Sequence, residues 1–190
     1  MRTALVLSLA ALALPGCAER IDYEDPDAVV LLDENYNPTD MKQIADKMTQ
    51  SMLRDPLFAE GAAHKPVIVV ERIQNSTHEH LDIQALSDRI ITGIVQSRRI
   101  EVVDETARQS LPAEYEYHAS GNVDPKTAKG PGHQVGADYA LRGVFTDQVH
   151  ETTDQKTRAV WYQVTLKLTD ISKGTIVWQE VKEIQKVRRK

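Results

Sequence analysis

The chain has 190 residues, with 28 acidic and 23 basic side chains and a formal net charge of −5. A chain this acidic is a poor general binder of nucleic acid, because that affinity comes mainly from Lys and Arg at the phosphates. Its single cysteine excludes an intramolecular disulfide and a cysteine-rich metal site.

Residues 1–16 are predicted to be a signal peptide. Arg2 precedes an apolar run, Ala4–Leu14, which Ser8 alone interrupts. This run of about 11 residues is shorter than the roughly 20 that a membrane-spanning helix needs. Leu14, Pro15, Gly16 and Cys17 follow it and resemble the lipobox of bacterial lipoprotein precursors. The alternative is an ordinary secretory signal with an accidental cysteine.

The lipobox resemblance implies that Cys17 is the first residue of the mature chain and carries diacylglycerol on its thiol and an acyl chain on its amine. Two or more acyl chains anchor a protein stably to a membrane. Ala18 stands where enterobacterial lipoproteins kept at the inner membrane usually have aspartate. The expected location is therefore the periplasmic face of the outer membrane, and no other cofactor is expected.

Residues 17–38 are predicted to be a lipidated acidic linker, and residues 39–190 a single globular domain. Within the linker, the apolar stretch AVVLL at 28–32 could dock on the domain or add an edge strand. At the other end, the basic residues of 181–190 are expected to form a solvated, frayed tail, although they could also contact anionic lipid or an acidic partner.

Hydrophobic periodicity predicts helices and strands in the domain. Apolar residues recur at helical spacing in 39–53, with Thr39 or Asp40 as the cap, and in 82–97. A short helix, 105–111, is expected to end at Pro112. Strands are predicted at 65–73, 100–104, 137–151, 160–171 and 174–184. This order predicts an α/β (α+β) fold: a mixed β-sheet flanked by helices and ending in an antiparallel meander.

No pattern of residues indicates catalysis or a metal site. Metal-ligand residue types occur together at His78, Glu79, His80 and Asp82. The two histidines, however, have no third ligand at a defined spacing, and Asp82 can instead cap the helix that begins at Ile83. The chain has no Walker loop, nucleophile elbow or zinc-protease motif. We therefore expect a protein that is not an enzyme and holds no metal.

The candidate partner-binding residues are Tyr115, Tyr117, His118, Asn122 and Trp161. The first four lie in a stretch, 112–125, with little amphipathic periodicity, and tyrosines presented from such a segment suit a protein interface. Alternatively, the tyrosines pack against the sheet edge. Trp161 alternates with Val160 and Tyr162, so it either faces solvent or packs under a helix on the other face of the sheet.

Several stretches behind the lipobox together resemble LpoB, the outer-membrane lipoprotein activators of penicillin-binding proteins. They are KPVIVVERIQNSTHEHLDI, YEYHASGNVDPKTA, VGADYALRGVF, YQVTLKLTDISKGTIVWQE and KEIQK, and the likeness covers residues 35–186. It implies a fold like the N-terminal domain of TolB. It also implies a monomer that binds a class A bifunctional penicillin-binding protein and stimulates its glycosyltransferase and transpeptidase activities, and it carries over no active-site residue.

The chain departs from the LpoB pattern in two places. Its linker, of about 21 residues, spans at most about 70 Å, whereas enteric members have a much longer tether. Gly130, Pro131 and Gly132 fall where the family has a continuous helix, so that helix should be broken or displaced. The alternative function is that of a lipoprotein subunit of another envelope assembly, such as a secretion or surface-appendage apparatus.

Overall fold

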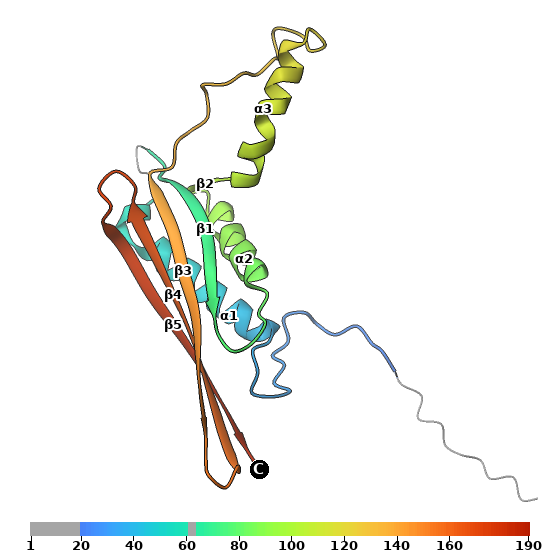
Figure 1. Cartoon of the computed structure of the whole chain (residues 1–190), viewed down its shortest axis with the longest axis vertical. Coiled ribbons are helices and arrows are strands. Elements are labelled where there is room, and N and C mark those ends of the chain that lie inside the picture. Colours follow the sequence, from blue (N-terminus) through green and yellow to red (C-terminus); the bar gives the residue numbers. More distant parts are fainter. Residues whose placement is uncertain (1–19, 61–63) are drawn as a thin grey trace, which may run out of the picture.

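The computed structural model describes residues 20–60 and 64–190, so Leu14, Pro15, Gly16 and Cys17 lie outside the described part of the chain. Figure 1 shows the order of the elements. The helices are α1 (Pro38–Arg54), the 3-10 helix η1 (Pro56–Phe58), α2 (Ile83–Gln96) and α3 (Glu105–Ala119). The strands are β1 (Val67–Ser76), β2 (Glu101–Val103), β3 (Tyr139–Glu151), β4 (Thr157–Asp170) and β5 (Ile176–Arg189).

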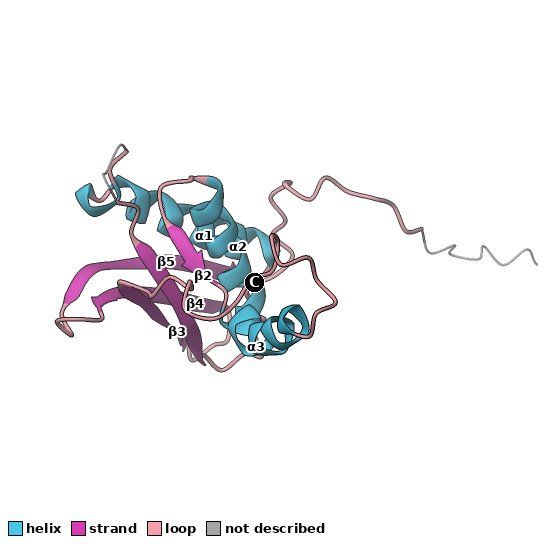
Figure 2. Cartoon of the chain, turned by 90° about the horizontal axis from the view of Figure 1, so that it is seen from above, coloured by secondary structure: helices cyan, strands magenta, loops and turns pink. Residues whose placement is uncertain are grey.

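The five strands form one mixed sheet in the order β2-β1-β3-β4-β5. β1 runs parallel to β2 and β3, while β3, β4 and β5 form an antiparallel meander. Helices α1 and α2 pack side by side on one face of this sheet (Figure 2). The predicted α+β class, with a mixed sheet that ends in a meander, is therefore confirmed.

The hydrophobic core lies between the sheet and the two packed helices. Helical spacing in α1 buries Ile44, Met48 and Met52, and in α2 it buries Leu86, Ile90 and Ile94. The alternating residues of β4 point to the same side and are all buried: Val160, Tyr162, Val164, Leu166 and Leu168. Full burial of one such side chain stabilises the fold by about 1.5–3 kcal/mol, so these two periodicities define the core.

The cap predicted for α1, Thr39 or Asp40, is wrong, because the helix begins at Pro38. Asn37 is the cap, since its side chain accepts a hydrogen bond from the Asp40 N–H while the Asp40 carboxylate accepts one from the Asn37 N–H. This reciprocal pair is a capping box, and Pro38 occupies the first helical turn, where its missing N–H does no harm. The cap predicted for α2 is confirmed, because the Asp82 side chain accepts from Ala85 N–H.

The predicted C-terminal ends of helix α3 and strand β5 are wrong. Helix α3 continues through Pro112 to Ala119, so the stretch predicted as irregular is mostly helical. A proline inside a helix removes one hydrogen bond and crowds the preceding turn, but it need not stop the helix. The basic C-terminal residues are not a frayed tail: they complete β5, which pairs with β4 as far as Arg189.

The acidic linker divides into two parts. Residues 28–32 form no strand and remain exposed, although Val30 N–H donates to Thr39 Oγ1 at 3.2 Å. Residues 33–37, here called the strap, lie against the domain: Glu34 is buried, and Tyr36 packs on the core beside Phe145 with ring centroids 5.1 Å apart. The chain thus begins to pack against the domain at the strap, before α1 starts.

Candidate partner-binding surfaces

Residues 105–137, here called the arm, project beyond the end of the sheet (Figure 1). The arm consists of α3 and the loop that leads back to β3. Asp104 caps the helix by accepting from Ala107 N–H, and no residue of α3 is fully buried in the described structure. Since helix stability in proteins comes mostly from tertiary packing, α3 needs another source of order.

The returning loop supplies that order by bonding along one side of α3. Arg108 Nη2 donates to the Val135 carbonyl at 2.9 Å, and Lys129 N–H donates to His118 Nδ1 at 2.8 Å. Gln134 Nε2 donates to the Tyr115 hydroxyl at 3.2 Å. Gly130, Pro131 and Gly132 lie in this loop, where no helix is present. The arm is therefore held together by its own polar contacts.

The candidate residues of the arm differ in their roles. His118 also contacts Glu114, one turn earlier, at 3.0 Å, so it is a structural residue of the arm. Asn122 Nδ2 donates to Ser120 Oγ at 2.8 Å and stabilises the turn after α3. Tyr117 is 54% exposed and faces solvent, whereas Tyr115 is half-buried under the loop. Tyr117 is thus the exposed aromatic residue of this group, and Asn122 is exposed near it in the chain.

Trp161 lies on a different surface, in the first half of β4. Its strand neighbours Val160 and Tyr162 point into the core, so Trp161 points to the opposite face, where it is 41% exposed. Helices α1 and α2 cover the other side of the sheet (Figure 2). Of the two alternatives, solvent exposure is therefore the one observed.

The arm and Trp161 are far apart. The arm leaves the sheet beside the start of β3, whereas Trp161 pairs with Gln148, nine residues further along that strand. At about 3.3 Å per residue the separation is about 30 Å along the sheet. The five candidate residues thus belong to two surfaces, because neighbouring residues of a strand face opposite ways and the arm extends from one end only.

The histidine stretch between β1 and α2 has a structural role. His78 Nδ1 lies 2.8 Å from Asp147 Oδ1, and the His78 N–H also donates to that carboxylate. The described residues contain no group of three or more histidine, cysteine, aspartate or glutamate side chains that could hold a metal ion. Glu79 instead accepts hydrogen bonds from the Tyr162 hydroxyl and the Tyr36 N–H.

These contacts seat the strap on the sheet. Burial is the main cause of the raised pKa of Tyr36, and burial together with the Glu79 hydrogen bond raises the pKa of Tyr162. Both hydroxyls thus stay protonated throughout the physiological range. Tyr162 acts as a donor to the carboxylate of Glu79, which links the β1–α2 loop to β4 and to the strap.

A second, charged cluster also holds the strap. Lys186 of β5 is 8% exposed, and its Nζ lies 2.6 Å from both Asp40 Oδ2 and the Asn35 carbonyl oxygen. Glu34 Oε1 lies 3.6 Å from Arg158 Nε and 3.5 Å from Arg188 Nε. Sequence inspection missed this cluster. Its one local signal was the capping-box pattern of Asn37 and Asp40, and that pattern carries no information about β5.

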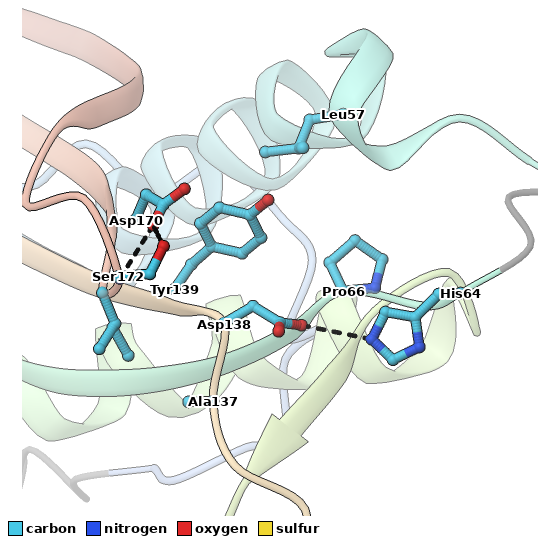
Figure 3. A pocket seen from close by; sticks show the side chains of 9 residues that line it. Leu57, His64, Pro66, Ala137, Asp138, Tyr139, Asp170 and Ser172 are labelled. Carbon is cyan, nitrogen blue, oxygen red and sulfur yellow. Dashed lines mark hydrogen bonds and ion pairs between the residues drawn. The ribbon is translucent and has the colours of Figure 1, made fainter.

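A cavity of about 450 Å³ opens at the end of the sheet where β3 begins (Figure 3). Two carboxylates in its lining accept hydrogen bonds from nearby groups. Asp138 accepts one from the Val67 N–H at 2.9 Å, and Asp170 accepts from the backbone N–H and the hydroxyl of Ser172. Hydrogen bonds from Ser172 and Lys173 lower the pKa of Asp170. These hydrogen bonds stabilise the start of β1 and the turn between β4 and β5.

Comparison with known proteins identifies the family. The family model described as peptidoglycan-synthase activator LpoB matches residues 40–184. Among solved structures, the LpoB C-terminal domain from Escherichia coli is 16% identical, with 76% of this chain and 98% of that chain covered and a TM-score of 0.47. The Salmonella enterica domain is also 16% identical, with 77% and 99% covered and a TM-score of 0.45.

Lipoprotein GNA1162 from Neisseria meningitidis is 14% identical, with 64% of this chain and 83% of that chain covered and a TM-score of 0.41. The search of curated proteins found no match. The family model spans nearly all of the folded domain, from the first turn of α1 to the middle of β5. The chain belongs to the LpoB family of peptidoglycan-synthase activators.

Proposed function

We propose that this chain is an outer-membrane lipoprotein, anchored through Cys17, that binds a class A bifunctional penicillin-binding protein as a monomer and stimulates it. The observation that carries the proposal is the family match over residues 40–184, since this family activates peptidoglycan synthases and is not itself catalytic. No helix in the described part of the chain could cross a membrane. A lipid on Cys17 would supply the attachment.

The arm is the proposed contact with the synthase. It projects from the domain, its bonds run between its own residues, and it presents the exposed ring of Tyr117. Tyrosine is enriched at interface hot spots because its ring buries a large area while its hydroxyl keeps a hydrogen bond. Glu105 and Glu116 are also exposed on α3, which favours a partner surface that is basic opposite them.

Activation requires that the domain bind the active conformation of the synthase more tightly than the inactive one. A tenfold shift of that equilibrium needs a difference of about 1.4 kcal/mol. A single well-placed aromatic contact is large enough to supply it. The proposed mechanism therefore needs no chemistry from the activator.

The strap shortens the tether that carries the domain. If Cys17 is lipidated, residues 18–32 connect the lipid to the strap, and about 15 residues span at most about 50 Å when fully extended. As a flexible coil the same segment typically spans about 20 Å. The synthase must therefore present its docking surface close to the outer membrane, and activation should depend on the width of that gap.

The test is capture of a synthase by the full chain, solubilised in detergent from envelopes, followed by a glycan-polymerisation assay. We expect a captured class A synthase that polymerises faster when the chain is added. Tyr117→Ala should weaken capture at least tenfold, while Tyr23→Ala, an equally simple change in the exposed tether, should not. Capture of another envelope complex, with no effect on any synthase, would contradict the proposal and favour a different assembly.

A further inference from the structure

The face of the sheet opposite α1 and α2 is open, and Trp161 lies on it just beyond the last pair of β1 with β3, where the sheet consists of β3, β4 and β5. In the register of the meander, Trp161 pairs with Gln148 on β3 and with Gln185 on β5. Strand alternation turns all three side chains to the open face, and all three are exposed. An indole thus stands between two primary amides, in a row that spans about 10 Å across three strands.

The neighbouring rows are mixed in character. Thr146, Gln163 and Glu183 form the next row, and the row on the other side contains His150, Ala159 and Val187. Arg142, two rows beyond Thr146, is bonded to Glu71 at 2.7 Å. The open face thus offers one indole, flanked within its own row by two amides that both donate and accept hydrogen bonds, with smaller apolar side chains such as Val187 in the adjoining row.

From this arrangement we infer that the open face binds a linear, β-linked amino-sugar strand, the class of polymer that a peptidoglycan synthase makes. A pyranose ring has an apolar face of C–H groups that stacks on an aromatic ring, and its edge carries hydroxyl and acetamido groups. Trp161 supplies the aromatic ring. Gln148 and Gln185 supply a donor and an acceptor on each side, over a distance comparable with one disaccharide.

A sugar fits this surface better than a protein does. The buried centre of a protein interface is more apolar than the general surface and holds several anchor residues together. Here Trp161 is the one large apolar side chain, its cross-strand neighbours are amides, and the other exposed apolar residues of this face on β5, Val181 and Val187, are small. The inference goes beyond the proposed function, because the open face and the arm are about 30 Å apart along the sheet.

The test is a titration of the full chain, in detergent and without any synthase, with chitotetraose and with soluble uncrosslinked glycan strands. The chain has two tryptophans, and Trp178 is 7% exposed, so a change in tryptophan fluorescence on binding reports mainly on Trp161. Isothermal calorimetry supplies a second readout for variants that lack Trp161.

We expect Trp161→Ala to weaken glycan binding at least tenfold, and Gln148→Ala or Gln185→Ala to weaken it several-fold. Tyr117→Ala, which removes an exposed aromatic residue of the arm, should bind glycan as the unmodified chain does. Circular dichroism checks that each variant is folded.

Three outcomes would overturn the inference: no binding of either glycan, unchanged binding by Trp161→Ala, or loss of synthase capture by Trp161→Ala in a protein that binds no glycan. The last would make the open face a protein interface. Synthase capture is measured without glycan and glycan binding without synthase, so failure of one proposal is distinguishable from failure of the other.

Discussion

Lys186 shows how one charged residue can hold distant segments together. It lies on the last strand, yet its ammonium group contacts Asp40 in the first helix and the Asn35 carbonyl of the strap. A buried charge is tolerated only when it is paired and hydrogen-bonded, because removal from water costs several kcal/mol. An inward-pointing charge also protects an edge strand such as β5 from pairing with other chains.

We expect Lys186→Ala to lower the free energy of unfolding by about 3–5 kcal/mol, because Asp40 would be left buried and unpaired. Lys186→Met combined with Asp40→Asn should recover at least half of that loss, since the uncharged pair needs no compensation. Urea unfolding followed by circular dichroism measures both. Lys167→Ala, on the exposed side of β4, is the matched control and should change stability little. An equal loss in both lysine variants would contradict the role given to Lys186.

Asp170 predicts a dependence of stability on pH. Its folded-state pKa is lowered by hydrogen bonds from Ser172 and Lys173, so the ionised form stabilises the β4–β5 turn. That stabilisation is complete above the unfolded pKa of about 3.9 and is lost as the pH falls toward the folded pKa. Asp170→Asn should therefore lower the Tm clearly at pH 7, and the difference should shrink below about pH 4. Thermal melts that differ equally at pH 7 and pH 2 would refute this.

At the scale of elements, α3 differs from α1 and α2. The latter two bury apolar stripes against the sheet, whereas α3 buries none of its described residues and carries a proline in its middle turns. Local stability follows buried contacts, so a segment without them opens independently of the rest. The arm should be the least stable part of the folded domain, as is typical of elements that order on binding.

Native-state hydrogen exchange should therefore be faster in residues 105–137 than in α1, α2 and β4. Pro112→Ala should slow exchange within α3, because a proline in a helix interior costs about 3 kcal/mol, but it should leave the urea midpoint of the whole domain nearly unchanged. Ile90→Ala, in the core, should instead lower the free energy of unfolding by about 2–5 kcal/mol. A shift of the global midpoint by Pro112→Ala would show that the arm unfolds with the domain.

At the scale of the whole molecule, the tether is fastened to the sheet by the strap. Glu34 lies near Arg158 and Arg188, Tyr36 packs on the core, and Asn37 caps α1. The point at which the chain leaves the folded domain is therefore set by the strap and not by a flexible joint at α1. The arm lies toward the other end of the sheet from the turn between β3 and β4 (Figure 1).

Two truncations test the strap. A chain that starts at Asp33 should be as stable as one that starts at Ala18, because residues 20–32 bury no side chain in the described structure. A chain that starts at Pro38 should lose about 3 kcal/mol, because it lacks the buried ring of Tyr36 and the Asn37 cap. Urea unfolding measures the difference. Equal stability of the three chains would mean that the strap does not contribute to the fold.

The sequence alone determined what depends on local spacing. The helical periodicities of α1 and α2, the Asp82 cap and the alternation in β4 were predictable, because each is visible within about a dozen residues. Helix α3 was predicted only in part, since its low amphipathicity and Pro112 resemble an irregular segment while its loop contacts come from residues 129–135. The motifs along the chain also predicted the family that the family model confirms.

The tertiary structure alone decided which residues share a surface. Trp161 and Tyr117 were predicted together as one kind of site, but Trp161 lies about 30 Å along the sheet from the end at which the arm of Tyr117 leaves it. The row of Gln148, Trp161 and Gln185 exists only through strand register. The last basic residues belong to β5 because Lys186 forms an ion pair with Asp40 and because β4 pairs with β5 as far as Arg189. Each of these outcomes depends on contacts between residues far apart in the chain, which local periodicity cannot encode.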